Sequence, residues 1–325
     1  MNVTPELAAA QEVLGPLART GVSLAPYCTY RVGGQAALWV EANSIEDFET
    51  VRAAIEVSGC PVLIVGKGSN LLVSDRGFDG IVVHLGDGFA EISVDTGSGG
   101  VVAGGAALLP VVARRTATAG LTGFEWAVGV PGSIGGAVRM NAGGHGSDMA
   151  ASLIRASVFD TTAGGPEEWT VNRLQLGYRR SALGPGHVVL YAELQLHPGD
   201  RIAAEAEISD IVRWRREHQP GGQNAGSVFA NPDGDSAGRV IDALDLKGHR
   251  IGTAEISPKH ANFIQADPDG SADDVFRLIV DVQHRVAAAT GVVLHPENRL
   301  IGFDHLNVGL ESSAAGPGPT ERGDG

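Results

Sequence analysis

Residues 123–146 read Gly-Phe-Glu-Trp-Ala-Val-Gly-Val-Pro-Gly-Ser-Ile-Gly-Gly-Ala-Val-Arg-Met-Asn-Ala-Gly-Gly-His-Gly, and the rest of the chain is organised around this stretch. Glycine tolerates positive φ and lets a backbone approach a ligand closely. Successive free N–H groups in such turns form a concavity that suits an anion. The apolar residues between the glycines can wall a flat ring. The stretch therefore favours a dinucleotide cradle, for a pyrophosphate and a ring system, over a tight turn between buried strands.

The composition of the chain argues against a nucleic-acid-binding, membrane-spanning or secreted protein. The chain has 325 residues and a formal net charge of −14, which disfavours a nucleic-acid partner because such a role needs a basic face. No run approaches the roughly 20 apolar residues that a membrane helix needs. The N-terminus lacks the basic and apolar segments of a signal peptide, and Cys28 and Cys60 fit a reducing compartment. We expect a cytoplasmic protein with no membrane partner.

A second glycine-bearing loop follows a predicted buried strand at 61–65. It reads Gly66-Lys67-Gly68-Ser69-Asn70-Leu71-Leu72-Val73. The third glycine of a GxGxxG fingerprint is missing, and an apolar run stands where a Rossmann unit would open a helix. Consecutive small residues and the charge of Lys67 are compatible with a phosphate nest. On the motif alone, a phosphate nest and a plain loop fit equally well.

Capping and turn signals divide the remaining chain into helices and strands. Ser44 and Gly59 bound one predicted helix, and Ser271 and Gly291 bound the clearest one, whose apolar residues follow helical spacing. Further helices are predicted from Thr4 and Ser236 onward and over 110–119 and 205–218. Strands are predicted over 37–40, 61–65, 81–83, 101–103, 153–159, 188–196, 260–264 and 292–294.

The predicted fold class is α+β, with a boundary at Pro198-Gly199-Asp200. We expect an N-terminal helix in residues 1–20, one domain over 21–199 and a second over 200–303. Residues 304–325 are rich in glycine, serine and proline, which predicts a disordered tail.

Several ordered motifs between residues 21 and 303 together resemble one family, UDP-N-acetylmuramate dehydrogenase, also called UDP-N-acetylenolpyruvoylglucosamine reductase (MurB). The motifs are Tyr30-Arg31-Val32-Gly33-Gly34, the loop 66–73, Gly129-Val130-Pro131-Gly132-Ser133-Ile134-Gly135-Gly136-Ala137, Asn141-Ala142-Gly143, Tyr178-Arg179-Arg180-Ser181, Gly226-Ser227-Val228-Phe229-Ala230-Asn231-Pro232, His260-Ala261-Asn262-Phe263 and Leu294-His295-Pro296-Glu297. Each motif is weak alone, and the ordered set is specific. The resemblance implies an FAD-binding domain of the PCMH/VAO type, made of two α+β subdomains, over 21–199. It also implies a smaller C-terminal α+β substrate domain over 200–303.

The resemblance also implies an activity. The family reduces the enolpyruvyl group of UDP-N-acetylglucosamine enolpyruvate to a lactyl ether for peptidoglycan synthesis, with electrons from NADPH passed through FAD. Hydride addition at the methylene carbon leaves negative charge spread toward the carboxylate, which calls for cationic or hydrogen-bonding partners. Arg179 and Glu297 match the family residues that act there, with Glu297 protonated so that it can donate. Ser227 matches the family's proton donor and needs neighbours to re-supply its proton.

Further site residues are assigned by the same resemblance. The predicted cofactor-binding residues are Gly66, Lys67, Gly68, Ser69, Asn70, Leu71, Pro131, Gly132, Ser133, Gly135, Gly136, Asn141, Gly143 and Gly146. The predicted substrate-binding residues are Tyr178, Arg215, His218 and Asn231. The remaining histidines show no metal-ligand spacing, so we expect no metal. We expect a monomer.

The chain departs from the family pattern at three positions. Ala230 and His218 stand where many members have lysine, and His145 stands where tyrosine is frequent. A histidine carries less charge at neutral pH than a lysine, so substrate contacts at His218 are expected to be weaker or dependent on pH. Two alternatives therefore stay open beside the reductase: another flavin oxidoreductase on the same scaffold, and a catalytically impaired flavin-binding paralogue.

Overall fold

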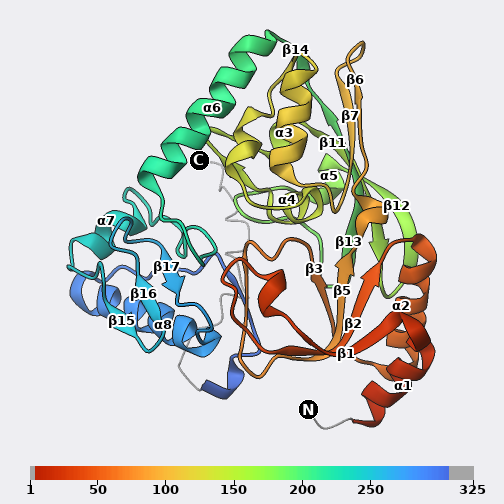
Figure 1. The fold of residues 1–325 in the computed structure, drawn as a ribbon, viewed down its shortest axis with the longest axis horizontal. Coiled ribbons are helices and arrows are strands. Elements are labelled where there is room, and N and C mark those ends of the chain that lie inside the picture. Colours follow the sequence, from red (N-terminus) through yellow and green to blue (C-terminus); the bar gives the residue numbers. More distant parts are fainter. Residues whose placement is uncertain (1–3, 307–325) are drawn as a thin grey trace, which may run out of the picture.

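The computed structural model describes residues 4–306, whose elements form three groups (Figure 1). The first group is a four-stranded sheet in the order β1-β2-β5-β3, with the two helices α1 and α2 packed into its apolar core. Its elements are α1 (Pro5–Leu14), β1 (Ala18–Ser23), β2 (Gln35–Ala42), α2 (Ile45–Ser58), β3 (Val62–Val65) and β5 (Phe78–Leu85). Strand β1 is antiparallel to β2, whereas β2 and β3 run parallel to β5.

The capping signals of the first group hold as predicted. Thr4 accepts from the Leu7 N–H, and Ser44 and Asp47 form a reciprocal capping box at the start of α2. Gly59 ends α2 in the left-handed region, with φ of 69°.

The second group is a five-stranded sheet in the order β12-β11-β13-β7-β6, and all its neighbouring strands are antiparallel. Its strands are β6 (Ile92–Asp95), β7 (Gly100–Gly104), β11 (Leu153–Asp160), β12 (Gly164–Thr170) and β13 (His187–Gln195). The accompanying helices are α3 (Leu109–Thr118), α4 (Ile134–Met140) and α5 (Val171–Leu174). Two short ladders pair β8 (Leu121–Thr122) with β14 (His197–Pro198) and β9 (Gly143–Gly144) with β10 (Ser147–Asp148).

The long helix α6 (Arg201–His218) follows the predicted boundary at residue 200. Its buried residues Ala204, Ile208 and Ile211 belong to the core of the second group, and Figure 1 shows α6 running beside α3 toward the third group. The helix is therefore anchored on the preceding domain and leads the chain to the next one. The domain boundaries stay predictions.

The third group has its own apolar core. It contains α7 (Ala237–Asp242), β15 (Arg250–Ile251), β16 (Ala254–Ile256), β17 (Ile264–Ala266) and α8 (Ala272–Thr290), with the strands in the order β15-β16-β17. Helix α8 buries one face, as its predicted spacing requires, from Ser271 as N-cap to Gly291 as C-cap. Tyr30, Val32 and Leu72 from the first part of the chain pack into this same core and join the two domains.

Two predicted strands of the third group are wrong. Residues 260–263 form a turn, in which the Phe263 N–H donates to His260 O at 3.1 Å, and β17 begins only at Ile264. Residues 292–294 make no ladder, and Leu294 O instead accepts from Gln283 Nε2 of α8 at 2.8 Å. Local polar contacts thus replace sheet pairing in both segments.

A final strand returns the chain to the first domain. Strand β18 (Arg299–Ile301) pairs in parallel with β4 (Leu71–Val73), directly after the loop that begins at Gly66. Residues 304–306, which were predicted to start the tail, form a short 3-10 helix, and the rest of the predicted tail lies outside the described residues. Within residues 4–306, none of the helices combines the length and apolar character needed to cross a bilayer.

Candidate functional site

The two glycine-rich loops lie against each other, although they are far apart in the sequence. A Cβ built on Gly66 would lie 2.7 Å from Ser133 Oγ, and one built on Gly132 would lie 3.4 Å from Ser69 Oγ. The second loop is fixed to the segment between β7 and the start of α3 by backbone bonds from Ile134 N to Ala107 O and from Leu109 N to Gly132 O. Side chains at the glycines would separate the loops, so their close approach depends on the absence of Cβ atoms.

A cavity of about 520 Å³ opens between these loops and the third group of elements. Most predicted site residues line it, namely Gly66, Lys67, Gly68, Ser69, Asn70, Leu71, Pro131, Gly132, Ser133, Gly136, Gly143, Arg179, Arg215, Ser227 and Glu297. Apolar side chains, among them Leu63, Phe78 and Ile301, complete the wall. The volume lies within the range of roughly 300–1,000 Å³ that is usual for cofactor and ligand sites.

The Glu297 side chain is held at the cavity by contacts from the first domain. The Tyr178 hydroxyl donates to Glu297 Oε1 at 2.8 Å, and Arg179 Nε lies 3.4 Å from Glu297 Oε2. Arg179 Nη2 also donates to Gly143 O at 3.1 Å, in a turn where Arg179 itself has φ of 52°. Burial, and then the bond to Glu297, raise the pKa of Tyr178. The carboxylate and the guanidinium are thus fixed side by side at the cavity wall.

The backbone of Glu297 is fixed as firmly as its side chain. Its N–H donates to Val228 O at 2.8 Å, and its carbonyl accepts from Asn70 Nδ2 at 3.0 Å. Asn298, which is buried, donates to Asn70 Oδ1 at 3.1 Å. Asn70 therefore links the first cofactor loop to the catalytic candidate across 227 positions of sequence.

Ser227 stands on a short segment that Asn262 stabilises. Asn262 is buried; its Oδ1 accepts from the Phe229 N–H and its Nδ2 donates to Phe229 O, both at 2.9 Å. Its carbonyl accepts the Val228 N–H at 2.9 Å. Because Val228 is buried whereas Ser227 is exposed and lines the cavity, this segment presents the hydroxyl to the cavity.

Three predicted cofactor residues lie outside the cavity lining and support it. A Cβ on Gly135 would lie 3.1 Å from Gly105 O, so this glycine allows α4 to pack closely on the strand region. Asn141 is buried, and its Nδ2 donates to Asp148 Oδ2 and to Gly177 O, which fixes the turn that carries Arg179. Gly146, with φ of 85°, forms the turn between β9 and β10.

Some of the predicted substrate residues also line the cavity, whereas others support the structure around it. Arg215 lines the cavity, donates to Gln219 Oε1 at 2.8 Å, and has a pKa lowered by burial. The His218 ring stacks on Trp214 with centroids 4.7 Å apart, and it does not line the cavity. Asn231 Oδ1 accepts the Ala237 N–H at the start of α7, so its carboxamide supports a helix rather than the cavity wall.

Two arginines that line the cavity were missed from sequence. Arg139 follows the second loop on α4, and Arg299 follows Glu297 on β18. Burial, and then the charge of Arg299, lower the pKa of Arg139 to about 10. Arg139 Nη1 donates to Gly184 O at 2.6 Å. The alternation of Glu297, Arg299 and Ile301 along an extended segment is the sequence signal that could have identified Arg299.

The lining of the cavity is cationic in an otherwise acidic protein. It contains Lys67, Arg139, Arg179, Arg215 and Arg299. Glu297 is its only carboxylate in the described part of the chain. Guanidinium groups and backbone N–H groups are the usual partners of phosphate oxygens. These donors, together with the glycine contacts and the apolar wall, fit a phosphate-bearing dinucleotide cofactor such as FAD.

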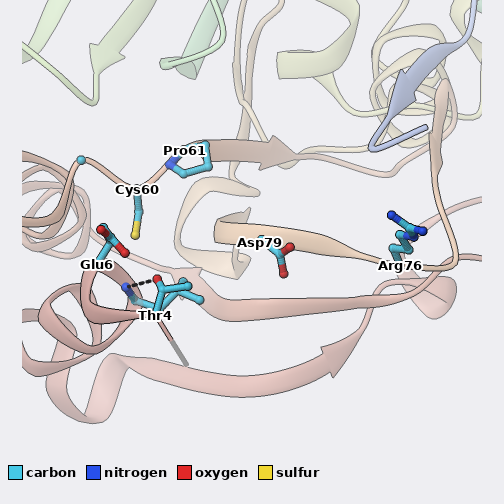
Figure 2. Close-up of a pocket in the computed structure, with 8 residues that line it drawn as sticks. Thr4, Glu6, Cys60, Pro61, Arg76 and Asp79 are labelled. Carbon is cyan, nitrogen blue, oxygen red and sulfur yellow. Dashed lines mark hydrogen bonds between the residues drawn. The ribbon is translucent and has the colours of Figure 1, made fainter. Parts of the chain in front are cut away.

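A second pocket, of about 490 Å³, lies on the outer side of the first sheet. Figure 2 shows Thr4, the N-cap of α1, and Glu6 of α1 beside Cys60, and Asp79 of β5 further along the pocket. It contains none of the motif residues that carried the prediction. The predicted catalytic and cofactor residues therefore gather at the cavity between the two domains and not at this pocket.

The fold and the cavity define a two-domain flavoprotein, in which an FAD-binding domain is followed by a smaller α+β domain that contributes side chains to the same site. Residues 36–164 match the family described as an FAD binding domain. Residues 218–301 match the C-terminal domain of UDP-N-acetylenolpyruvoylglucosamine reductase.

Relatives that match over nearly the whole chain give the particular family. The UDP-N-acetylenolpyruvoylglucosamine reductase of Syntrophotalea carbinolica is 37% identical over 292 residues, which are 90% of this chain and 96% of the relative. That of Synechococcus elongatus is 42% identical over 86% of this chain and 93% of the relative. The crystal structure of the reductase (MurB) from Thermus caldophilus superposes with a TM-score of 0.76 at 34% identity, covering 88% of this chain and 100% of that one. The chain belongs to the UDP-N-acetylenolpyruvoylglucosamine reductase family.

Proposed function

We propose that this protein is an NADPH-dependent flavoenzyme that reduces UDP-N-acetylglucosamine enolpyruvate to UDP-N-acetylmuramate for peptidoglycan precursor synthesis. The observation that carries the proposal is the meeting of Ser227 and Glu297, from the C-terminal domain, with both glycine loops at one cavity. A cofactor-binding site alone would not require the side chains of the second domain.

The residues that would hold FAD are those of loops 66–71 and 130–136, with Arg139 and Arg299 as additional cations. Loop 66–71 would supply backbone N–H groups and the arginines would supply forked donors, both of which suit a diphosphate. In loop 130–136 the N–H groups of Gly132, Ile134 and Gly135 already donate to backbone carbonyls, so this loop would contribute mainly its close backbone approach. When bound, FAD supplies hydride exchange with a nicotinamide and with the substrate at its N5 position.

Arg179 and Glu297 would act on the enolpyruvyl carboxylate. Arg179 is pre-oriented by Gly143 O and Glu297, so its guanidinium does not have to reorganise when negative charge develops at the substrate. The Tyr178 hydroxyl holds the other oxygen of Glu297 at 2.8 Å. A fixed cation with a fixed hydrogen-bonding carboxyl group beside it stabilises an enolate-like charge distribution without a metal ligand.

Ser227 would deliver the proton that completes the reduction. A serine hydroxyl is a weak acid, so its efficiency depends on exact placement and on proton re-supply from solvent or a neighbouring group. The Asn262 contacts to Phe229 and Val228 provide the placement. The exposed position of Ser227 allows re-supply from water.

The oligomeric state, location and partners of the enzyme follow from the same proposal. We infer a monomer that acts in the cytoplasm on small anionic substrates, with no nucleic-acid partner. The substrate contacts predicted for His218 and Asn231 would then require a rearrangement on substrate binding, because neither side chain lines the cavity.

Replacement of Ser227 by alanine tests the proposed function. We expect S227A to retain FAD and its reduction by NADPH, and to lose turnover with the enolpyruvyl sugar by orders of magnitude. The matched control is Ser93→Ala, an exposed serine on β6. NADPH oxidation with and without the enolpyruvyl sugar measures both. Turnover of S227A close to that of S93A would remove Ser227 from the mechanism, and re-oxidation by air alone in the parent would favour an oxidase.

A further inference from the structure

Hydrogen bonds tie the turn after β4 to the first turn of α8 in the other domain. Asp75 Oδ1 accepts the Ala272 N–H at 2.9 Å, and Asp75 Oδ2 accepts the Asp273 N–H at 3.2 Å. The Ser271 hydroxyl also donates to Asp75 Oδ2. In return, the Asp75 N–H donates to Asp273 Oδ1 at 3.1 Å. We call the group of Asp75, Ser271, Ala272 and Asp273 the α8 clasp.

The hydrogen bonds of the α8 clasp are additional to the N-cap that α8 already has. Ser271 already caps the helix by accepting the Asp274 N–H at 3.2 Å. A carboxylate at a helix N-terminus is favoured by the free N–H groups and the helix dipole, but here it comes from the other domain, 198 positions away from Asp273. The turn that carries Asp75 is itself held in place, because Ser74 O accepts from the N–H groups of Gly34 and Gly77, both at 2.9 Å. The clasp therefore sets the orientation of α8 relative to the cofactor domain.

Strand β4 connects the clasp to the active-site cavity. At its start, Asn70 donates to Glu297 O at 3.0 Å and accepts the Arg299 N–H at 2.9 Å. At its end, the Ser74 N–H donates to Ile301 O at 2.9 Å, one residue before Asp75. Between these points β4 and β18 pair in parallel. Asp75 and Glu297 thus stand at opposite ends of one pair of strands.

Helix α8 also supports the segment that carries Glu297 from the other side. Gln283 Nε2 of α8 donates to Leu294 O at 2.8 Å. Pro296 forms a bridge with Phe229, and the Glu297 N–H donates to Val228 O, directly after Ser227. A shift of α8 would therefore move Glu297 and Ser227 together.

We propose that Asp75 is a positioning residue of the reductase: by fixing the N-terminus of α8 to β4, it holds Glu297 and Ser227 of the C-terminal domain against the cofactor loops. This inference rests on the proposed function. Asp75 does not line the cavity, so it acts only through these other residues. Misplacement of catalytic groups by about 1 Å can lower a rate by about 100-fold.

Asp75→Ala removes both carboxylate oxygens through which Asp75 accepts from Ser271, Ala272 and Asp273. We expect kcat for enolpyruvyl reduction to fall at least about tenfold with FAD content unchanged. Asp75→Asn retains one acceptor oxygen, and asparagine serves helix N-termini about as well as aspartate. D75N should therefore recover most of the lost rate, an outcome that a loss of general stability would not produce. The matched control is Asp79→Ala, an exposed carboxylate four residues further along that lines the separate pocket in Figure 2.

The experiment measures three quantities for each variant: FAD per chain, the single-turnover rate at which the enolpyruvyl sugar re-oxidises dithionite-reduced enzyme, and amide hydrogen exchange over 271–275 and 297–301. A slow D75A, a largely restored D75N, an unchanged D79A, and faster exchange at both segments in D75A support the proposal. A parental rate in D75A, a rate loss that only follows FAD loss, or a D75N as slow as D75A overturns it. If D75A does not fold, Asp75→Ser, which keeps one short acceptor, replaces it in the same assays.

The hydrogen-exchange measurement separates this inference from the proposed function. If the parent enzyme is not re-oxidised by the enolpyruvyl sugar, the proposed function fails. Exchange over 297–301 still reports whether Asp75 fixes the segment of Glu297, because it needs no substrate. Unchanged exchange in D75A would overturn the clasp whatever the substrate of the enzyme is.

Discussion

The cofactor loops and the C-terminal domain face the same cavity, but they are built by different means. The loops offer backbone groups, and their shape depends on glycines such as Gly66 and Gly132 that touch Ser133 and Ser69. The C-terminal wall offers side chains, Ser227 and Glu297, which long-range hydrogen bonds from Asn70 and Asn262 hold in place. The contrast indicates that the first wall binds and the second wall reacts. Substitutions should therefore separate the loss of cofactor from the loss of chemistry.

The largest effect is expected on the backbone-built wall, from Gly68→Ala. Gly68 has φ of 59°, and a Cβ there would lie 1.9 Å from Tyr27 O, so the loop cannot keep its place. We expect a loss of at least about 3 kcal/mol of stability together with loss of bound flavin. Flavin absorbance and thermal unfolding check this. Gly221→Ala, where a Cβ meets nothing within 4 Å, is the control. A yellow G68A protein as stable as G221A would contradict the role given to the loop.

The next effect is expected on the wall built from side chains. Glu297→Gln keeps the size of the group and one acceptor oxygen, but it can neither carry the charge that pairs with Arg179 nor take up and release a proton. We expect turnover with the enolpyruvyl sugar to fall about 100- to 1,000-fold, with flavin content unchanged. Steady-state kinetics at matched flavin loading measures this, with the exposed Glu217→Gln on α6 as control. Loss of flavin in E297Q would contradict the assignment of cofactor binding to the loops and of chemistry to the C-terminal wall.

A smaller effect, on FAD affinity, is expected at Arg139. This residue follows the second loop, and its charge interacts with that of Arg299 from the C-terminal wall. A buried guanidinium beside Arg299, with its pKa lowered to about 10, is stabilised when an anion binds. Arg139→Met should weaken FAD binding about tenfold or more, the worth of a charge-assisted hydrogen bond, while the apoprotein unfolds at nearly the same temperature. Titration of apoprotein with FAD measures this, and Arg173→Met, on a surface arginine paired with Glu167, is the control. Unchanged FAD affinity in R139M would remove Arg139 from the cofactor site.

The smallest effect concerns pH at His145, whose ring lies against Trp214 of α6. Burial, and then the charge of Arg215, lower the pKa of His145 from 6.5. The folded protein therefore disfavours the charged imidazole, and stability should decline as pH falls through about 6.5, the value in the unfolded chain. His145→Gln should slightly flatten the dependence of the unfolding temperature on pH between about 5 and 7.5, whereas the exposed His284→Gln should not. Identical curves for H145Q and the parent would show that this histidine is not linked to folding.

The cofactor loops and the C-terminal wall also differ in how much of their structure could be predicted from the sequence. The capping residues Ser44 and Ser271 predicted helices of the α+β fold, because a helix cap depends on nearby residues. The FAD-binding domain was predicted from the resemblance of the ordered motifs to a known family. Long-range contacts cannot be predicted from neighbouring residues in the same way. The use of Asn231 to support α7, the packing of α6 on the first domain, and the pairing of β4 with β18 depend on residues distant in sequence.

The cavity arginines show the same limit. Arg139 and Arg299 carry no motif of their own, and their importance follows only from burial in a cavity that the folded chain creates. The two wrong strands, at 260–264 and 292–294, have a related cause. Their apolar residues satisfy a strand pattern, but a turn at His260 and the Gln283 side chain take the hydrogen bonds that a sheet would have used.

The division between a wall that binds and a wall that reacts is tested most directly by anaerobic stopped-flow kinetics on the parent enzyme and E297Q, followed by flavin absorbance. Both proteins should be reduced by NADPH, and the enolpyruvyl sugar should rapidly restore the oxidised spectrum of the parent while restoring that of E297Q at least about 100-fold more slowly. A parent that stays reduced when the enolpyruvyl sugar is added, or an E297Q that re-oxidises as fast as the parent, would contradict it.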